Sequence, residues 1–266
     1  MILKNENEQF KTIDYMQEES VVIISINRPE AMNSFNAQLR SELLYGLKRA
    51  ASANDTRVII IKGNGKNFSA GADLKNTEDV HKSLEEVLNR EYRPIFDLIS
   101  NIDIPVIASV HGSAAGIGLS LALCCDLMIM SDDAFLLAPF TSISLAPDGG
   151  MNWFLVHQLG YRKAFQICIE SERISAEYCV DNGLANKCVP AENLFSETLI
   201  WAKNIAKRAP LSVTATKKIM RYAASHSWSE TYDMEVPVQQ KLIDSNDFTE
   251  GVRAFIEKRE PGFNGD

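Results

Sequence analysis

Residues 105–130 read PVIASVHGSAAGIGLSLALCCDLMIM, and this apolar stretch decides the fold. Its length would suit a membrane span, but His111, the small residues of Gly112 to Gly118 and Asp126 interrupt it. The pattern therefore predicts buried elements in the order strand, turn, helix and strand, at residues 105–110, 112–118, 116–125 and 127–131. No membrane partner is expected.

The same alternation continues toward the N-terminus. Runs of β-branched residues predict strands at residues 21–26 and 58–62, and leucines at helical spacing predict a helix within residues 36–54. An amphipathic pattern at residues 84–96 predicts another helix before the strand at 105–110. Strands that alternate with helices indicate an α/β fold with a parallel sheet and crossover helices.

The C-terminal half has a different pattern. Short strand-like pieces follow from Phe135 to Leu145, and the sheet is expected to end near Leu145. From Gly150 onward the signals are helical, with Ser175 as a plausible N-cap and Gly183 as a C-terminal stop. No internal repeat and no low-complexity linker is found.

The composition limits which kinds of protein this chain can be. The chain has 266 residues, of which 45% are hydrophobic and 23% are charged, which is enough for one substantial core. Its 35 acidic residues outnumber 27 basic ones, so the formal charge of -8 disfavours a nucleic-acid partner. The N-terminal sequence MILKNENEQF has no basic region followed by an apolar one, so export is not expected.

Cysteines and histidines give no metal or disulfide pattern. The five cysteines are odd in number and form no CxxC, which favours a reducing cytoplasm over a disulfide framework or a zinc site. The four histidines show neither HxxxH nor HExxH spacing, so no metal is expected. His111, at a strand end, is expected to be packed or hydrogen-bonded.

Two loops are candidates for ligand binding. In Phe68 to Leu74, which follows a strand, Asp73 could cap a helix and leave backbone N-H groups near Ala72 free for an anion. The loop Gly112 to Gly118 lacks bulk, so a ligand could approach its backbone closely. Taken alone, a loop such as Phe68 to Leu74 is more often a structural turn, and helix-on-sheet packing explains the small residues of Gly112 to Gly118 equally well. Gly116-x-Gly118 is not a dinucleotide fingerprint, because Leu121 stands where a third glycine is needed.

Local sequence gives no strong catalytic signal for Asp148 or Ser120. Asp148 lies in Pro-Asp-Gly-Gly at residues 147–150, a pattern more typical of a turn than of a catalytic site. Ser120 is not in a GxSxG elbow, so a hydrolase triad is disfavoured.

Several motifs in their order and spacing resemble the crotonase, or enoyl-CoA hydratase/isomerase, superfamily. They are Ser25 to Ser34 (SINRPEAMNS), Phe68 to Leu74 (FSAGADL), Pro105 to Ala108, Gly112 to Asp126, Pro147 to Gly150, Arg173 to Glu177 and Phe255 to Arg259. The resemblance covers essentially the whole chain. It implies a crotonase (ClpP/crotonase-like) spiral of ββα units over residues 1–195 and a C-terminal helical region at 196–266 that forms trimers or hexamers.

The resemblance also implies a site. The family's two thioester-gripping backbone N-H groups map onto Ala72 and Ile117, and one such preorganised donor is typically worth about 10²- to 10³-fold in rate. Its CoA contacts map onto the loop around Ala70 and Asp73, onto Lys75 and onto the C-terminal aromatic Phe263, besides the acyl wall at Phe140. No cofactor is implied beyond the coenzyme A of the substrate.

The sequence departs from the family's hydratases at their two glutamates, where it has Ser120 and Phe140. Neither side chain can activate water or protonate carbon, so ordinary hydration is disfavoured. Phe140 and Asp148 instead reproduce the spacing of the ring-opening phenylacetate-pathway isomerases. Asp148 would serve as both base and acid, and an apolar wall from Phe140 and Leu137 would raise its pKa.

The leading hypothesis is an acyl-CoA isomerase that converts 3-enoyl-CoA to 2-enoyl-CoA or acts on an epoxyphenylacetyl-CoA-like ring. One alternative is another crotonase activity, such as hydratase or dienoyl-CoA isomerase. A second is a non-catalytic acyl-CoA-binding or RNA-binding member. For RNA, a basic helix within residues 202–221 would serve, although a solvated helical face explains these charges as well.

Overall fold

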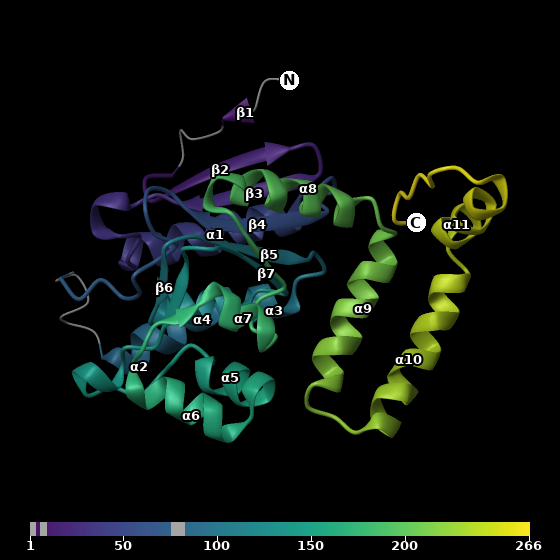
Figure 1. The fold of residues 1–266 in the computed structure, drawn as a ribbon. Coiled ribbons are helices and arrows are strands. Elements are labelled where there is room, and N and C mark those ends of the chain that lie inside the picture. The colour runs from purple at the N-terminus through teal and green to yellow at the C-terminus, as the bar shows by residue number, and fades with distance from the viewer. Residues whose placement is uncertain (1–3, 6–9, 76–82) are drawn as a thin grey trace.

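The computed structural model describes residues 4–5, 10–75 and 83–266. Its larger sheet has the strand order β1-β2-β3-β4-β5-β7-β10 within these residues (Figure 1). The strands are β1 (Lys4–Asn5), β2 (Ile13–Glu18), β3 (Val21–Ile26), β4 (Val58–Gly63), β5 (Val106–Val110), β7 (Leu127–Ser131) and β10 (Lys187–Val189). From β3 to β10 all neighbours are parallel, whereas β1, β2 and β3 are antiparallel. The predicted parallel sheet is confirmed, but β2 was not predicted.

Both faces of the sheet are covered, and for this reason its strands are nearly continuous apolar runs. Alternate residues of β3 point to opposite sides: Ile24 packs toward α1 (Ala37–Ser52), and Ile23 packs toward α8 (Leu194–Ala206). The predicted helix at 36–54 is confirmed, and the Asn36 side chain caps it by accepting a hydrogen bond from the Leu39 N-H at 2.9 Å.

The predicted amphipathic helix at 84–96 is present but extends further and contains a π-helical turn. It consists of α2 (Leu84–Val87), the π turn Leu88–Tyr92 and α3 (Arg93–Asn101). Pro94 has no N-H to donate within the helix, and a π turn directly before it accommodates the missing bond.

A smaller sheet of β6 (Ser113–Ala115), β8 (Phe135–Leu137) and β9 (Ile174–Ser175) lies beside the helices that follow. These helices are α4 (Ile117–Cys124), α5 (Met151–Leu159), α6 (Tyr161–Glu170) and α7 (Ala176–Asp181). Ser175 caps α7 as predicted, and Gly183 follows its end with φ +73°. The expectation that the sheet ends near Leu145 was wrong, since β9 and β10 come later. Strands of two and three residues give no periodic pattern, so only tertiary pairing reveals them.

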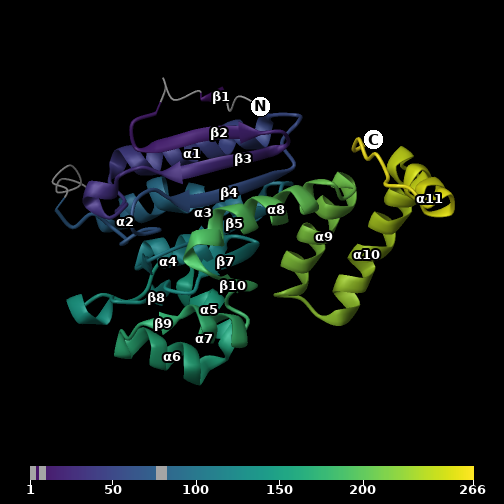
Figure 2. The same ribbon diagram turned by 45° about the horizontal axis from the view of Figure 1, so that its top comes forward.

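The last three helices extend away from the sheet (Figures 1 and 2). They are α9 (Pro210–Ala223), α10 (Trp228–Ile243) and α11 (Asn246–Glu257), and residues 210–266 are called the C-terminal arm below. By contrast, α8 packs on the sheet face, where Leu194 and Ala202 are buried with β3 and β4.

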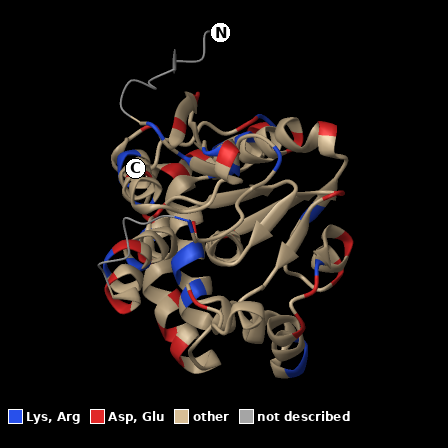
Figure 3. Cartoon of the chain, turned by 90° about the vertical axis from the view of Figure 1, so that its left-hand side faces the viewer, with Lys and Arg blue, Asp and Glu red and all other residues tan. Residues whose placement is uncertain are grey.

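None of the helices in the described ranges is both long and apolar enough for a membrane crossing. Charged residues of both signs are mixed on the outer helices and loops, whereas the strands are mainly free of charge (Figure 3).

Candidate active site

The two candidate loops meet at a pair of glycines. Strand β6 pairs with the first loop through a Ser69 to Ala114 bridge, and this places Gly71 against the turn before α4. A Cβ on Gly71 would lie 2.9 Å from the Ala115 carbonyl oxygen, and one on Gly116 would lie 3.7 Å from the Gly71 Cα. Both glycines have positive φ, at +98° and +54°. The positive φ at both positions and the tight contact at Gly71 favour glycine, and Ala72 and Ile117 directly follow these two glycines in their loops.

A network of buried amides holds the loops in register. The Asn33 side chain is fully buried and donates to the backbone oxygens of Asn64 and Asn67 at 2.8 and 2.6 Å. The Asn67 side chain accepts from the Ser113 N-H and hydroxyl at 3.2 and 2.9 Å, and the Ser69 hydroxyl donates to the Asn33 oxygen at 2.8 Å. The loops after β3, β4 and β5 are thus joined by satisfied hydrogen bonds, which favours one fixed geometry.

The backbone N-H groups of Ala72 and Ile117 are available to a ligand. Phe35 donates to the Gly71 oxygen and accepts from the Asp73 N-H, so the Ala72 N-H between them does not join this bridge. Ile117 is the first residue of α4, where an N-H has no partner inside the helix. Neither N-H donates to an acceptor within the described part of the chain. Two unpartnered backbone donors in neighbouring loops, one of them at a helix N-terminus, suit an oxyanion.

The loop that carries Asp148 rests on the first turn of α4. The Ser120 hydroxyl, fully buried, donates to the Asp148 backbone oxygen at 2.9 Å. A Cβ on Gly149 would lie 2.5 Å from the Ile117 Cδ1 and 2.8 Å from the Ser120 Cβ, and Gly149 has φ +63°. The helix that presents the Ile117 N-H therefore also supports the Asp148 loop.

The surroundings of the Asp148 carboxyl group disfavour its charged form. Its Oδ1 is buried and has no hydrogen-bond partner within the described ranges. Burial raises the pKa of Asp148 to about 6, although its own backbone N-H opposes this shift. A carboxyl group in these surroundings can accept and return a proton near neutral pH.

Phe140 lies next to the paired loops. It is 7% exposed, and its Cζ would lie 4.0 Å from a Cβ on Gly116. Leu137, the last residue of β8, accepts a hydrogen bond from the Gly116 N-H at 3.0 Å through its backbone oxygen. The two expected wall residues thus flank the second loop.

A cavity of about 360 Å³ borders the Asp148 loop at Gly149 and Gly150. It is called the α3–α5 cavity here, because most of its other lining residues belong to the π turn with α3 and to α5. The remaining lining is Leu88, Asn89, Tyr92, Arg93, Phe96, Asp97, Ser100, Cys124, Trp153 and Phe154. Its aromatic walls suit an apolar group that extends from a reaction centre at Asp148.

The other expected binding residues lie in varied positions. The Asp73 carboxylate forms an ion pair with Arg28 at 2.9 Å and accepts from the Lys75 N-H at 3.2 Å, which makes a turn at residues 73–75. A helix capped by Asp73 would run through residues 76–82, outside the described residues. Ala70 donates its N-H to the Met32 backbone oxygen at 2.9 Å. Lys75 follows later in the same loop, and its side chain is exposed.

Phe263 does not lie with the two loops. A Cβ on Gly251 of α11 would lie 3.4 Å from its ring, and it lines a cavity of about 500 Å³ within the C-terminal arm. In this structure Phe263 therefore packs on its own chain, against α11.

Some residues with a clear structural role at the site were missed by local sequence reasoning. Asn33 was part of a quoted motif but received no role, and its φ of +57° is the signal of a specialised turn position that a sequence shows only indirectly. Arg28 donates to the Ser34 oxygen and to Asp73, and so links the loop after β3 to the Ala72 loop.

No group of three or more metal-ligating side chains occurs in the ranges that the structure covers. His111 is bonded through Nε2 to the Gly65 oxygen at 3.1 Å, as expected, and burial lowers its pKa. The basic segment at 202–221 is not one helix, because α8 ends at Ala206 and α9 begins at Pro210. Several of its cations pair with carboxylates: Lys203 with Glu18 and Glu19, Lys217 and Arg221 with Asp126, and Lys218 with Asp103.

Known proteins resemble this chain over almost its full length. Residues 16–266 match the family model described as enoyl-CoA hydratase/isomerase. A probable enoyl-CoA hydratase of Rhodobacter capsulatus is 36% identical, with 96% of this chain and 99% of that protein covered. A trans-2-decenoyl-[acyl-carrier-protein] isomerase of Streptococcus mutans is 31% identical (96% and 99% covered), and a 1,2-epoxyphenylacetyl-CoA isomerase of Escherichia coli is 30% identical (93% and 96% covered).

A solved structure described as an enoyl-CoA hydratase subunit from Geobacillus kaustophilus has the same fold. It superposes with a TM-score of 0.91 at 31% identity, and the match covers 97% of this chain and 100% of that one. The expected fold class is confirmed.

Proposed function

Since the chain belongs to the enoyl-CoA hydratase/isomerase family, or crotonase superfamily, we propose that it is an acyl-CoA isomerase with Asp148 as its proton shuttle. The observation that carries the proposal is the Asp148 Oδ1, buried and without a hydrogen-bond partner in the described part of the chain, on a loop whose next residue, Gly149, packs against Ile117 and Ser120 of α4. Serine and phenylalanine occupy the two positions at which the family's hydratases have glutamates.

The first step is removal of a proton from C2 of a 3-enoyl thioester. The developing negative charge on the thioester oxygen would be held by the N-H groups of Ala72 and Ile117, which are preorganised by the backbone. An Asp148 carboxylate with a pKa of about 6 is a stronger base than an ordinary aspartate and is still ionised at neutral pH.

The second step returns the proton to C4 and gives the 2-enoyl thioester. One carboxyl group suffices, because the proton that it takes from C2 is the proton that it donates to C4. The proposed acyl site is the α3–α5 cavity, where the aromatic side chains would exclude water from the dienolate. A second carboxylate would be needed to activate water for hydration, and Ser120 uses its hydroxyl to hold the Asp148 loop.

The names of the relatives leave both the substrate and the reaction open. One relative is named as a trans-2-decenoyl-[acyl-carrier-protein] isomerase and another as a 1,2-epoxyphenylacetyl-CoA isomerase, so our proposal includes both linear and ring-type acyl-CoA substrates. The relative named as a probable hydratase makes hydration the rival activity.

We also propose which residues contact CoA, that the protein forms an oligomer, and that it is located in the cytoplasm. Ala70, Asp73 and Lys75 would contact CoA, and residues 196–266 would contribute to a trimer or hexamer. The C-terminal arm has many exposed apolar side chains that a second copy could cover. They include Met220, Trp228, Val236, Ile243, Phe255 and Ile256. Phe263 would then contribute to the CoA site of a neighbouring copy.

The test is single-turnover product analysis in deuterated water with a 3-enoyl-CoA, beside the matching 2-enoyl-CoA. We expect wild type to move the double bond without hydrating 2-enoyl-CoA. Asp148→Asn should lose the activity, and Asp181→Asn, an exposed carboxylate on α7, should keep it. Efficient hydration of 2-enoyl-CoA by wild type would refute the isomerase in favour of the hydratase. If wild type leaves 3-enoyl-CoA unchanged but binds it, the linear substrate is wrong and ring-type thioesters are next.

A further inference from the structure

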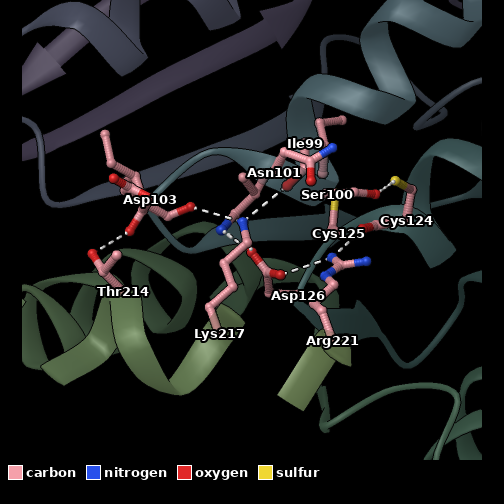
Figure 4. Close-up of polar contacts among 12 residues, drawn as sticks. Ile99, Ser100, Asn101, Asp103, Cys124, Cys125, Asp126, Thr214, Lys217 and Arg221 are labelled. Atoms are coloured by element: carbon pink, nitrogen blue, oxygen red, sulfur yellow. Dashed lines mark hydrogen bonds and ion pairs between the residues drawn. The ribbon is translucent and has the colours of Figure 1, made fainter. Parts of the chain in front are cut away.

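The C-terminal arm is attached to the core by a half-buried cluster of charges (Figure 4). The Asp126 carboxylate pairs with Lys217 at 2.7 Å and with Arg221 at 2.8 Å, one turn apart on α9. Asp126 also accepts the Val106 N-H at 2.9 Å. The Lys217 side chain is only 7% exposed, and burial lowers its pKa although Asp126 opposes this effect. Such a group must keep its partners, because an unpaired buried charge is costly.

The same two cations bind the ends of two core helices. Lys217 donates to the backbone oxygens of Ile99 and Ile104 at 2.9 and 3.0 Å, at and just beyond the last turn of α3. Arg221 donates to the oxygen of Cys124, the last residue of α4, at 2.8 Å. Cations are stabilising at helix C-termini, where carbonyl groups have no partner inside the helix.

These helix ends form a buried wall of the α3–α5 cavity. Ser100 of α3 and Cys124 of α4 both line the cavity, and their side chains lie 3.5 Å apart. Cys124 is 1% exposed. Arg221 therefore touches the backbone of a cavity residue, and Lys217 touches the residue before Ser100. The opposite end of α4 carries Ile117 and Ser120, so the position of this helix also affects the oxyanion donors and the Asp148 loop.

We propose that Lys217 and Arg221 are positioning residues that fix the wall of the α3–α5 cavity at Ser100 and Cys124, so that the docking of the arm controls which acyl groups the cavity accepts. The assignment of the cavity to the acyl group rests on the proposed function. The link between arm and wall rests only on the contacts above.

The Cys124 thiol provides a readout that does not need turnover. Its alkylation by N-ethylmaleimide would be timed in the whole protein, and tandem mass spectrometry would separate it from Cys125. We expect Arg221→Gln and Lys217→Met to accelerate alkylation by about fivefold or more, in line with energetic coupling through packed elements. Burial raises the pKa of the Cys124 thiol and Arg221 opposes this shift, so loss of the Arg221 charge alone would slow the reaction. Acceleration would thus report an opened wall.

Lys218→Met is the matched control, because Lys218 lies on the same helix and pairs with Asp103 at the surface. It should leave the Cys124 rate unchanged, and Arg221→Lys, which retains a cation, should be closer to wild type than Arg221→Gln. Unchanged rates in folded Arg221→Gln would overturn the proposal, as would equal acceleration by Lys218→Met. If Lys217→Met does not fold, Arg221→Gln alone decides.

Binding of saturated thioesters tests the acyl part. The affinity ratio of decanoyl-CoA to hexanoyl-CoA should change about fivefold in Arg221→Gln, while affinity for free CoA stays the same. An unchanged ratio would refute control of acyl choice. If neither thioester binds wild type or slows its Cys124 alkylation, the proposed function is wrong. The alkylation rates of the variants would still test whether the arm fixes the wall of the α3–α5 cavity.

Discussion

Asp148→Asn should make the protein more stable at alkaline pH while it abolishes the proposed isomerisation. The folded protein raises the pKa of Asp148 from the ordinary 3.8 to about 6, so folding disfavours the carboxylate. Above pH 6 both folded and unfolded chains are ionised, and the folded chain bears the full cost. As pH falls from 6 toward 4 the folded carboxyl is protonated while the unfolded one is still largely ionised, and the cost disappears.

The size of the effect follows from the shift. A difference of about two pKa units corresponds to about 3 kcal/mol, and we reduce this to about 2 kcal/mol because the side chain is only partly buried. The asparagine is uncharged, so it should gain about 2 kcal/mol in unfolding free energy at pH 8 and almost nothing at pH 4.

Urea unfolding at both pH values, at one protein concentration, measures this difference. Asp181→Asn, at an exposed position on α7, is the control and should not gain stability at pH 8. If Asp148→Asn gains nothing at pH 8, or gains equally at pH 4, then burial does not hold the proton on Asp148.

Three further outcomes are expected. The kcat/KM of the proposed isomerase reaction should fall about tenfold per pH unit below about pH 6, since Asp148 would act as a base only in its carboxylate form; a profile that stays flat down to pH 4.5 would contradict this. Gly149→Ala places a Cβ 2.5 Å from the Ile117 Cδ1 at a positive φ, so kcat should fall by about tenfold or more with a loss of about 1–3 kcal/mol in urea unfolding; wild-type kinetics would show that the loop is not held against α4. Lys217→Met should lower the unfolding free energy by about 1–3 kcal/mol, because Asp126 keeps Arg221 and the Val106 N-H as partners, whereas Lys218→Met, at an exposed ion pair, should cost less than about 1 kcal/mol; equal losses would mean that Lys217 is not buried in solution.

Much of the fold follows from local patterns, because the central strands are long, β-branched and separated by clear helical periods. β10 was missed for a physical reason: Lys187 to Val189 becomes a strand only because β7 offers it an edge. The π turn before Pro94 likewise depends on the helix continuing through the proline.

The site also has parts that local sequence predicts and parts that depend on tertiary contacts. The loops at Ala72 and Ile117 could be found from small residues at strand ends, but their meeting depends on the close approach of Gly71 and Gly116, which are 45 residues apart in sequence. For Asp148, local sequence favours a turn, and only the resemblance suggested chemistry. Its burial against α4 depends on Gly149 and Ser120, and no local pattern shows that contact.

The contact of Gly71 with Gly116 also bears on how the chain could be altered. The groups proposed to bind the thioester oxygen are main-chain atoms, so substitutions at positions 120, 140 and 148 would leave them in place provided that the loops keep their shape. Recognition of the enolate and the handling of its proton are then separable properties. A small library at these three positions could search for new reactions of one common intermediate, including the addition of water, without rebuilding the pocket that forms it.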